Sequence, residues 1–585
     1  MASRLHFVGQ VLEVGGERIV RDAFTPSDRA DAVVAATEFA LGSFVEVWRE
    51  PGGVRQVCVA AAGSARAALY ALVREQGLDP AHPDAVEREA LAILADPGID
   101  DATLVDRTEL PFVTVDGPGT RDLDQALYVA PDGDGWIAHY AIADAAWYVR
   151  PGSALFDEAL ARGASYYLPG LSIPMLPRNL SEGVISINAG VDRRALSFVM
   201  RIGPDGECRG TTFERVRLRS RAKLEFGQVQ ALLDGADGHG IDDQGVQASL
   251  FALRDAGEAR LRAAAERDLV RHRHEEIRVK LDDGPDYEFV VISELRDEVE
   301  RYGEQLSLLC NIEGAHLLRE GARDRDLVQP VYRVHAPPEP ERMAELVATI
   351  DAACAFHGVP QWRWQPEHEP LSAYLERLAN EAPGAGAAKS IGDGRDRLAR
   401  ALLRQAVLVN VRSSFSAEPA PHFGIGADVY ARFSAPMREV VGVFVHKEAW
   451  EALRKAPPSR DDEALRARVI EAANAAKDRQ RSLTHGANLL VLDRMFARDA
   501  ALPPEQRPPR RGTVMGAAPR KLYVRLDEPA VDVKIYGDAF GSDDPAPVVT
   551  TTEGREVACA LGCAIDVRVR AHDPRGHRWL LEIVG

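Results

Sequence analysis

The stretch from residue 109 to residue 129, ELPFVTVDGPGTRDLDQALYV, constrains the fold more than any other part of this chain. Residues 112–115 are aromatic and β-branched, which is typical of a buried strand. Gly-Pro-Gly at 117–119 ends that strand in a loop, and a second strand-like run covers residues 126–129. We therefore expect two neighbouring strands of a sheet, joined by a loop that is rich in acids.

Three aspartates, Asp116, Asp122 and Asp124, lie in or beside this loop. Carboxylates held this close repel one another unless protons or a cation intervene. Their hard oxygen atoms suit Mg²⁺ or Mn²⁺, which take further ligands from water and phosphate. A solvated turn is the alternative, because Asp and Gly are ordinary turn residues. The acids alone do not decide between the two interpretations.

The composition bounds the class of protein. The chain has 585 residues, enough for several domains, and a net charge of −18. This acidity argues against a protein that is covered in nucleic acid, but not against one that guides a strand into a local basic channel. The six scattered cysteines favour a reducing cytoplasm. We find no signal peptide and no apolar run long enough for a membrane span, so we expect a cytoplasmic protein outside the membrane.

A basic run follows at residues 214–223, ERVRLRSRAK. Its cations lie mostly at alternate positions, which on a strand places them on one face. Both an RNA-facing surface and a solvated strand face agree with this pattern. The cations are Arg215, Arg217, Arg219, Arg221 and Lys223.

The hydrophobic patterns predict an α+β multidomain protein with four segments. Residues 1–105 contain short strands followed by two helices, which agree with a winged-helix module or with a helical adaptor. Residues 106–455 form a large mixed region, and residues 456–511 a helix with a Pro-rich linker. Residues 512–585 contain five alternating strands, GTVMG, KLYVRL, AVDVKIYG, AIDVRVRAHD and HRWLLEIVG, which predict a small β-barrel.

Several segments in a fixed order resemble the ribonuclease II family of 3′→5′ exoribonucleases, whose catalytic part is the RNB domain. They are IAHYAIADAAWYV (137–149), YLPGLSIPMLPRNLSEGVISINAGVDRRALSFVM (167–200), RAKLEFGQVQALLDG (221–235), GEQLSLLCNIEGA (303–315) and PHFGIGADVYARFSAPMREVVGVFVH (421–446). The likeness covers roughly residues 108–455. The C-terminal barrel is similar to an S1 RNA-binding domain, whereas the N-terminal segment does not resemble the paired cold-shock barrels that usually begin such proteins.

The resemblance implies a catalytic site. Asp116, Asp122 and Asp124 match the first three of the family's four catalytic aspartates, and Gln125 stands at the fourth position. A neutral glutamine oxygen is a weaker ligand than a carboxylate, and on a regular strand Gln125 and Asp124 point to opposite faces unless a bulge intervenes. Arg438 matches the arginine that grips the scissile phosphate.

The resemblance also implies RNA contacts. Tyr167 matches the aromatic residue that stacks on bases at the RNA 3′ end, and Tyr166 is an alternative for that role. The second aromatic of this clamp is missing near residues 279–281. Glu304 matches the acid that recognises the ribose 2′-hydroxyl, with Phe226 where the family has tyrosine.

On the S1-like barrel, Lys521 and Tyr523 share one strand face and are candidate RNA contacts, with Lys534 and Tyr536 beside them. Packing or solvation of the barrel explains the same four residues equally well.

The expected function is processive hydrolysis of single-stranded RNA from its 3′ end to 5′-nucleoside monophosphates, with Mg²⁺ or Mn²⁺ and as a monomer. The alternative is an RNA-binding homologue with lost or weak catalysis. Four departures from the family pattern favour it, namely Gln125, Phe226, Glu439 and Gly442.

No nucleophilic Ser–His or Cys–His constellation is visible. We expect His422, His446 and His485 to be structural, and His272 and His274 to be exposed to solvent.

Overall fold

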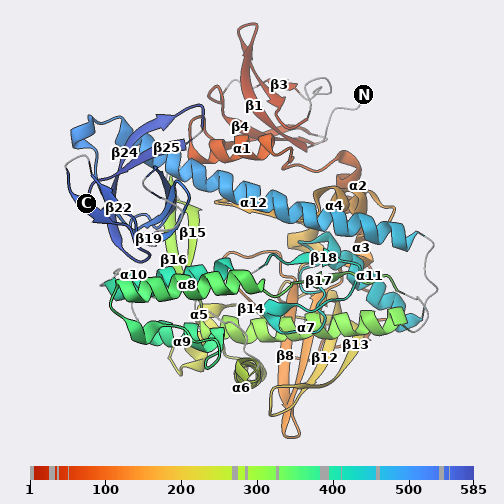
Figure 1. The fold of residues 1–585 in the computed structure, drawn as a ribbon. Helices are drawn as coiled ribbons and strands as arrows, with labels where there is room; N and C mark the ends of the chain where they lie inside the picture. Colours follow the sequence, from red (N-terminus) through yellow and green to blue (C-terminus); the bar gives the residue numbers. More distant parts are fainter. Residues whose placement is uncertain are drawn as a thin grey trace. The chain divides into compact units, whose positions relative to one another are not determined.

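The computed structural model describes residues 6–25, 33–35, 38–50, 52–266, 275–282, 288–323, 328–381, 394–409, 411–455, 461–538, 540, 546–551, 554–576 and 578–585. The chain forms two compact units (Figure 1). The first consists of residues 1–267, 297–336 and 413–484. The second consists of residues 268–296, 337–412 and 485–585. Helix α12 (Asp462–Ala500) begins in the first unit and ends in the second.

The first unit begins with a five-stranded antiparallel sheet of order β3-β2-β1-β4-β5. Its strands are β1 (His6–Val14), β2 (Glu17–Asp22), β3 (Val33–Ala35), β4 (Phe44–Glu50) and β5 (Gly53–Ala60). Gly15 and Gly16 join β1 to β2 with φ values of 62° and 85°, and a two-residue hairpin turn of this kind needs positive φ at both positions. This sheet has an apolar core of its own around Phe7 and Val45.

The winged-helix interpretation of this segment is replaced by that sheet. In a winged helix the helices form the core, whereas here five strands do so before any helix begins. Helices α1 (Ala65–Glu75) and α2 (Asp84–Ala95) follow the sheet. Helix α1 begins at Ser64, whose hydroxyl accepts a hydrogen bond from the Ala67 N–H at 3.1 Å. Helix α2 packs against α4 (Ala154–Arg162), whereas α1 contacts β5 of the five-stranded sheet.

The centre of the first unit is a seven-stranded sheet of order β14-β7-β8-β9-β12-β13-β6. The strands β7, β8, β9, β12 and β13 pair antiparallel with their neighbours, and β6 and β14 add parallel edges. Their bounds are β6 (Val105–Asp106), β7 (Val113–Asp116), β8 (Gln125–Asp132), β9 (Gly135–Ala143), β12 (Asp192–Ile202), β13 (Cys208–Arg219) and β14 (Ala222–Glu225). The two strands expected on either side of the acidic loop are β7 and β8.

Helices and short strands surround this sheet. Helix α6 (Gln244–Glu266) packs on β8, and α7 (Glu298–Arg323) packs on both α6 and α11 (Val440–Arg454). The remaining elements of the unit are α3 (Ala145–Tyr148), β10 (Tyr166–Leu168), β11 (Leu171–Ile173), η1 (Asn179–Val184), α5 (Phe226–Leu233), α6 (Gln244–Glu266), α7 (Glu298–Arg323), β17 (Tyr332–Val334), β18 (Ser414–Ser416), η4 (Phe423–Ile425) and α11 (Val440–Arg454).

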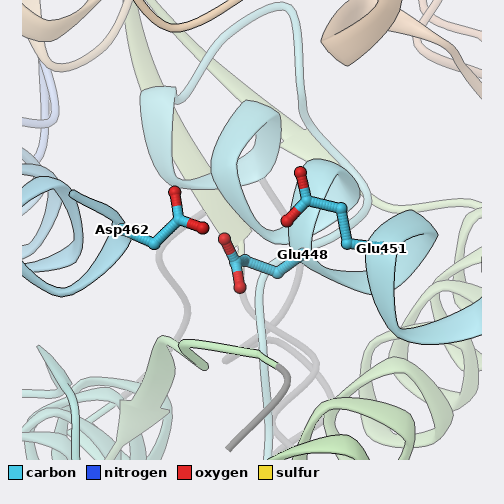
Figure 2. Close-up of side chains that lie close together, drawn as sticks. All are labelled: Glu448, Glu451 and Asp462. Atoms are coloured by element: carbon cyan, nitrogen blue, oxygen red, sulfur yellow. The ribbon is translucent and has the colours of Figure 1, made fainter. Parts of the chain in front are cut away.

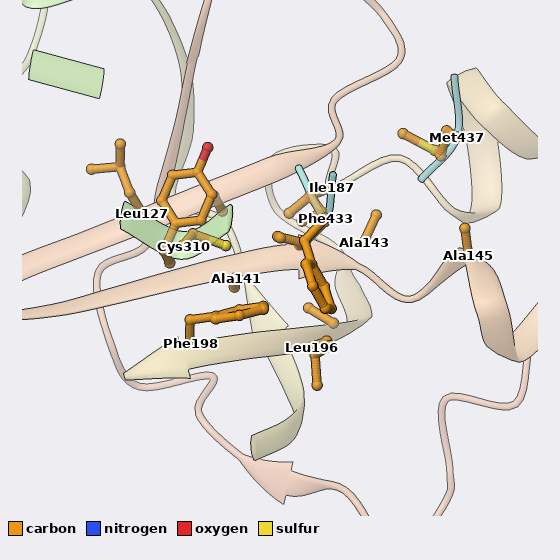
Figure 3. Packing of buried hydrophobic residues seen from close by; sticks show 14 of the residues in the cluster. Leu127, Ala141, Ala143, Ala145, Ile187, Leu196, Phe198, Cys310, Phe433 and Met437 are labelled. Carbon is orange, nitrogen blue, oxygen red and sulfur yellow. The ribbon is translucent and has the colours of Figure 1, made fainter. Parts of the chain in front are cut away.

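A dense apolar core fixes the segment after residue 432 against the sheet. Phe433 is fully buried and meets Phe198 of β12 edge to face, with ring centroids 5.4 Å apart (Figure 3). Its ring also fills the space beside Gly314 of α7, where an added Cβ would come within 2.4 Å of the ring. Glycine is therefore needed at 314 so that α7 can approach this segment.

In the described part of the chain, the second unit contains the C-terminal barrel, the helices α8 (Pro340–Phe356), α9 (Leu371–Glu381) and α10 (Gly394–Leu408), and the C-terminal part of α12. The barrel sheet has the order β21-β20-β19-β24-β25, and β21 contacts β25, which closes the barrel. Its strands are β19 (Arg510–Ala518), β20 (Lys521–Leu526), β21 (Asp532–Tyr536), β24 (Ala564–Asp573) and β25 (Arg578–Ile583). These are the five strands predicted from the sequence. The N-terminal sheet has the same order of its first to fifth strands.

The barrel shares its core with its helical neighbours. The side chain of Gln405 on α10 donates a hydrogen bond to the Met515 carbonyl at 2.6 Å, and Met515 packs among α8 and α10. The other elements of the unit are β15 (Glu275–Leu281), β16 (Phe289–Leu295), α8 (Pro340–Phe356), η2 (Pro360–Trp362), α9 (Leu371–Glu381), α10 (Gly394–Leu408), η5 (Pro504–Gln506), β22 (Val548–Thr550) and β23 (Glu556–Ala558).

The α+β multidomain architecture is thus confirmed. Among the described residues, no helix is both long enough and apolar enough to span a bilayer.

Candidate active site

The acidic loop between β7 and β8 brings two aspartates to the same end of the sheet. Asp116 is the last residue of β7, and Asp124 immediately precedes β8. Val113 of β7 pairs with Leu127 of β8, and the charge of Asp124 contributes to raising the pKa of Asp116, so the two carboxylates lie near each other. The sheet therefore holds two of the three predicted acids side by side.

Asp124 is the buried centre of the site. Only 1% of its surface is exposed, and its Oδ1 accepts a hydrogen bond from the Met437 N–H at 3.1 Å. Its Oδ2 accepts from Nε of Arg438 at 2.5 Å. Asp124 and Arg438 are 314 positions apart in the sequence, so the fold joins the two motifs that the family resemblance singled out.

Asp122 lies at the more exposed side of the same loop. The hydroxyl of Tyr167 donates to its Oδ2 at 3.3 Å, and the Tyr167 side chain is 48% exposed. The loop itself is fixed by Ser186, whose Oγ donates to the Arg121 carbonyl at 2.8 Å and accepts from the Leu123 N–H at 3.0 Å. An aromatic face is thus available to solvent directly beside the acids.

Three hydrogen bonds to backbone groups fix the segment that carries Arg438. The buried Asn311 of α7 accepts from the N–H groups of Phe433 and Ser434 at 2.7 and 3.1 Å through its Oδ1. The Arg438 carbonyl accepts from the Ser165 N–H at 2.8 Å, two residues before Tyr167. Asn311 is a positioning residue that the sequence did not reveal, because a lone asparagine in a helical pattern carries no distinctive signal.

The electrostatics of the acids favour a bound cation. Burial raises the pKa of Asp116 to about 6, although the Arg438 charge opposes this rise. Burial also raises the pKa of Asp124, against the opposing effect of Arg438. The Oδ2 atom of Asp116 is buried and has no hydrogen-bond partner among the described residues. A divalent ion would satisfy that oxygen and stabilise the ionised carboxylates, so the three aspartates fit such an ion.

The three carboxylates are not close enough to enclose an ion by themselves. Within the described part of the chain, oxygens of all three do not lie within 4.8 Å of one another. An ion here would complete its shell with water or phosphate, as Mg²⁺ commonly does.

Gln125 is the first residue of β8 and pairs with Ile142 of β9. The Ala143 N–H donates to the Asp124 carbonyl at 2.8 Å, so regular pairing continues through Asp124, and the described register of β8 and β9 shows no shift. The side chains of Asp124 and Gln125 therefore point to opposite faces. The role of Gln125 as a metal ligand stays a prediction, and this pairing does not favour it.

The alternative role for Tyr166 is wrong. Its side chain is fully buried, and its hydroxyl donates to the Arg162 carbonyl at 2.5 Å and accepts from Arg479 at 3.0 Å. Alternation along β10 turns Tyr166 inward and Tyr167 outward.

Glu304 and Phe226 lie on two helices that pack together, α7 and α5. Phe226 directly follows Glu225, which pairs with Asp116 at the end of the parallel β14–β7 ladder. Glu304 is exposed on α7. The proposed role of this pair in recognising the ribose stays a prediction.

The basic strand at residues 215–219 is not a free surface. Arg215 pairs with Asp144 at 2.7 Å, Arg217 with Asp106 at 2.5 Å and Arg219 with Asp192 at 2.7 Å. These partners come from distant segments of the chain. The solvated or paired strand face is therefore the better interpretation of that run.

On the barrel, Lys521 and Tyr523 do share one face of β20, while Leu522 between them is buried. Tyr523 pairs with Lys534 and Lys521 pairs with Tyr536 across the β20–β21 ladder. The four side chains therefore form a patch of alternating amines and rings. Tyr523 is also partly packed against the α8–α10 core, so its position agrees both with an RNA contact and with packing of the barrel.

His422 and His446 are buried, which agrees with a structural role, whereas His485 of α12 is exposed and its structural role stays a prediction. Burial lowers the pKa of His446 to about 4 and that of His422 to about 3. Nε2 of His446 lies 2.9 Å from the Phe433 carbonyl, behind the segment that carries Arg438. His272 and His274 lie outside the described residues.

A second group of acids surrounds the ammonium group of a lysine. Glu448, Glu451 and Asp462 face one another where α11 ends and α12 begins (Figure 2). Nζ of Lys447 donates to all three, at 2.8, 2.9 and 3.0 Å respectively. The ammonium group occupies the position that a cation would need, so this cluster serves as a clamp between two helices.

A cleft of about 440 Å³ adjoins Tyr167 and Arg438. The strand β17, the helix α12 and the segment before α11 form its walls. Its charged lining residues are Arg333, Arg432, Arg438, Glu439, Lys477 and Arg481.

Comparison with known proteins agrees with this fold and site. The RNB domain model matches residues 105–455, which is more than half of the chain. This chain belongs to the RNB domain family.

A relative named Exoribonuclease 2, from Edwardsiella piscicida, is 29% identical over 368 residues, which are 63% of this chain and 53% of that relative. The chain thus spans about half the length of that curated relative. A solved structure of Mycoplasma genitalium RNase R in complex with ribose-methylated single-stranded RNA matches 99% of this chain and 90% of its own, with a TM-score of 0.75 and 18% identity. Yeast Ssd1, described as a pseudonuclease, matches 98% of this chain and 68% of its own, with a TM-score of 0.59 and 14% identity.

Proposed function

We propose that this protein is a metal-dependent exoribonuclease that shortens single-stranded RNA processively from the 3′ end to 5′-nucleoside monophosphates. The observation that supports it most is the convergence of Asp116, Asp122 and Asp124 with Arg438 at one end of the central sheet. Membership of the RNB domain family supports the same conclusion.

Asp116, Asp122 and Asp124 would hold the divalent ion, Mg²⁺ or Mn²⁺. The ion, when bound, supplies Lewis-acid chemistry, since it polarises a phosphate oxygen and acidifies water. A phosphate that binds beside Asp124 would come within reach of the Arg438 guanidinium, which offers several N–H donors to its oxygens. Arg438 would then neutralise the charge that develops on phosphorus as the P–O bond breaks.

Tyr167 would position the substrate. Its exposed ring beside Asp122 offers a stacking face for a base near the cleaved bond, and stacking accepts any base. Glu304 with Phe226 would recognise the ribose, and Lys521 with Tyr523 would bind RNA upstream on the barrel. A phenylalanine at 226 lacks the hydroxyl of tyrosine, so we expect weaker discrimination against DNA, on the order of one hydrogen bond or about 1 kcal/mol.

The second candidate function is RNA binding without hydrolysis. The fold does not decide between the two, because both an RNase R and a pseudonuclease share it. Two departures from the family pattern have a packing explanation. Glu439 pairs with Arg432 at 3.2 Å, and an added Cβ at Gly442 would lie 2.8 Å from the Pro436 backbone. Glu439 and Gly442 therefore differ from the family pattern without disturbing the contact between Asp124 and Arg438.

Incubation with 5′-labelled single-stranded RNA and Mg²⁺ or Mn²⁺ tests the proposal. We expect a ladder that shortens from the 3′ end and disappears when EDTA is added. RNA that stays intact while it is retained by the protein in a filter-binding assay would support the second candidate instead.

A further inference from the structure

Two cations in the cleft beside Arg438 have no acidic partner among the residues that the structure describes. Arg333 of β17 and Lys477 of α12 are both half-buried, and neither makes an ion pair with any described residue. The other cations of the cleft are paired: Arg432 with Glu439, Arg438 with Asp124 and Arg481 with Asp478. The cleft therefore carries positive charge that the described residues do not neutralise.

Ser413 brings these two cations together. Its hydroxyl accepts from Nε of Arg333 at 3.2 Å and from Nζ of Lys477 at 3.2 Å. Lys477 also donates to the Ser413 carbonyl, and its Nζ lies 5.4 Å from the centre of the Phe415 ring. Neutral oxygens and an aromatic ring fix the two head groups without removing their charge.

The surroundings disfavour the charged forms of both groups. Burial, together with the nearby Arg333 charge, lowers the pKa of Lys477 to about 8, although Glu439 opposes this shift. Burial also lowers the pKa of Arg333, with Arg432 adding to the effect and Glu439 opposing it. An anion bound between the two cations would reverse these effects, since it favours the charged forms.

The place of the cleft limits which anion it would take. This step depends on the proposed function, in which Arg438 contacts the scissile phosphate and the 3′-terminal nucleotide lies beyond it. The cleft adjoins Arg438 and Tyr167 and has a volume of about 440 Å³. Beyond the scissile phosphate, an exonuclease substrate has only one further phosphate position, which is a phosphate on its 3′-terminal hydroxyl.

We propose that Arg333 and Lys477 bind a 3′-terminal phosphate, so that the protein accepts RNA ending in a 3′-phosphate as well as RNA ending in a 3′-hydroxyl. A terminal phosphate monoester carries close to two negative charges at neutral pH, more than a backbone diester, and so suits two unpaired cations. Hydrolysis of such an end forms a bond between a water oxygen and phosphorus, and it breaks the bond between phosphorus and the 3′ oxygen of the preceding nucleotide. That oxygen takes a proton, and the first product leaves as a nucleoside 3′,5′-bisphosphate.

Binding in EDTA tests the site without hydrolysis. Two fluorescent RNAs of one sequence, ending in a 3′-hydroxyl or a 3′-phosphate, are titrated with the full-length protein. We expect the 3′-phosphate end to bind roughly 10-fold more tightly, as one or two charge-assisted hydrogen bonds would give. Lys477→Met and Arg333→Met should each reduce this preference, whereas Lys477→Arg should keep it because the charge remains. Arg481→Met is the matched control, because Arg481 lines the same cleft but is paired with Asp478.

The outcomes separate the site from the enzymatic activity. Equal affinity of the wild-type protein for both ends overturns the proposal, even if RNA with a 3′-hydroxyl is degraded. Equal weakening of both RNAs by Lys477→Met also overturns it, because the cleft would then bind the RNA backbone. A preference that persists while neither RNA is degraded in Mg²⁺ supports the site and contradicts the proposed function.

Competition with orthophosphate distinguishes the two sources of a phosphate. If orthophosphate abolishes the preference for the 3′-phosphate end, the site binds that terminal phosphate. If orthophosphate binds while the two RNAs bind equally, the site binds free phosphate and not the RNA end, and the proposal fails. Mass spectrometry of the first product in Mg²⁺ should show the bisphosphate, and its absence during rapid degradation of the 3′-hydroxyl RNA would contradict acceptance of that end.

Discussion

At the scale of residues, the contact between Arg438 and Asp124 joins the acidic loop before β8 to the segment before α11. We expect Arg438→Lys to lower kcat by about 100-fold or more, because a lysine ammonium cannot reproduce the planar, multidentate grip of a guanidinium on phosphate. KM should change less, since the contact is strongest in the transition state. Steady-state kinetics with Arg454→Lys as control, on the exposed end of α11, measures this effect. If KM rises while kcat stays unchanged, Arg438 stabilises the bound substrate and the transition state equally, which would contradict this role.

The pKa of Asp116 makes ion binding depend on pH. In the metal-free protein this pKa is raised from 3.8 to about 6, so the folded state binds a proton more tightly than the unfolded chain does. The stability of the metal-free protein should therefore fall as pH rises from about 4 to about 6. The increase in Tm on adding Mn²⁺ should be largest above pH 7 and should shrink as pH falls through about 6. Thermal unfolding across this range measures it, and an equal increase at pH 5 would exclude Asp116 as a ligand.

Several site residues were predictable from the sequence because the chemistry is concentrated in short motifs. Asp116, Asp122, Asp124 and Arg438 were predicted in this way, and the fold joins Asp124 to Arg438, while their catalytic roles stay predictions. The choice between Tyr166 and Tyr167 was not, since it depends on which face of the short strand β10 meets the core. Arg333 and Lys477 also escaped notice, because they come from separate elements and carry no motif.

At the scale of elements, Lys447 stabilises the junction of α11 and α12 (Figure 2). We expect Lys447→Met to lower the free energy of unfolding by about 3–5 kcal/mol at pH 8, because three carboxylates would lose their shared cation. Urea unfolding measures the change, and Lys455→Met, at the exposed C-terminal end of α11, is the control. A loss of less than about 1 kcal/mol would show that water compensates for the missing ammonium.

The same cluster has a defined pH dependence. Burial raises the pKa of Glu448 from 4.5 to about 7, so the contribution of this group to stability falls as pH rises between those values. Protonation of the cluster should therefore make Lys447→Met less destabilising at pH 5 than at pH 8.

The strands of the acidic loop and the barrel could be predicted because their patterns are local. The β1-β2-β3 hairpins were only partly visible in the sequence, since ERIVRD and the short β3 lack a long apolar run. The Asp partners of Arg215, Arg217 and Arg219 depend on pairings between distant segments, which one sequence does not reveal.

At the scale of the whole molecule, the barrel is part of a larger unit with α8 and α10. Arg397 of α10 donates to Asp527 at 2.6 and 3.0 Å and to Thr513 at 2.6 Å, and its side chain is only 7% exposed. We expect Arg397→Met to destabilise the second unit by about 3 kcal/mol, because Asp527 would lose its buried partner. Arg404→Met is the matched control: Arg404 pairs with Asp532 at 2.8 Å but is more exposed, so its loss should cost under about 1 kcal/mol. Equal effects in urea unfolding would show that the barrel folds independently of the helix.

The domain limits drawn from the sequence at 106–455 and 512–585 stay predictions. Contacts divide the chain differently, because residues 337–412 belong to the same compact unit as the barrel. A single sequence gives no signal for this division, since the apolar faces of α8 and α10 agree equally well with a partner in either unit. The cytoplasmic location and the monomeric state also remain predictions.

The most direct test of the central claim is the identity of the released nucleotide. Wild-type protein and Asp124→Asn are incubated with the same RNA and Mn²⁺, and the small products are measured by mass spectrometry. The account predicts 5′-nucleoside monophosphates from the wild-type protein and at least about 100-fold less from Asp124→Asn, with RNA affinity retained. Binding of RNA by both proteins with no mononucleotide from either would contradict it.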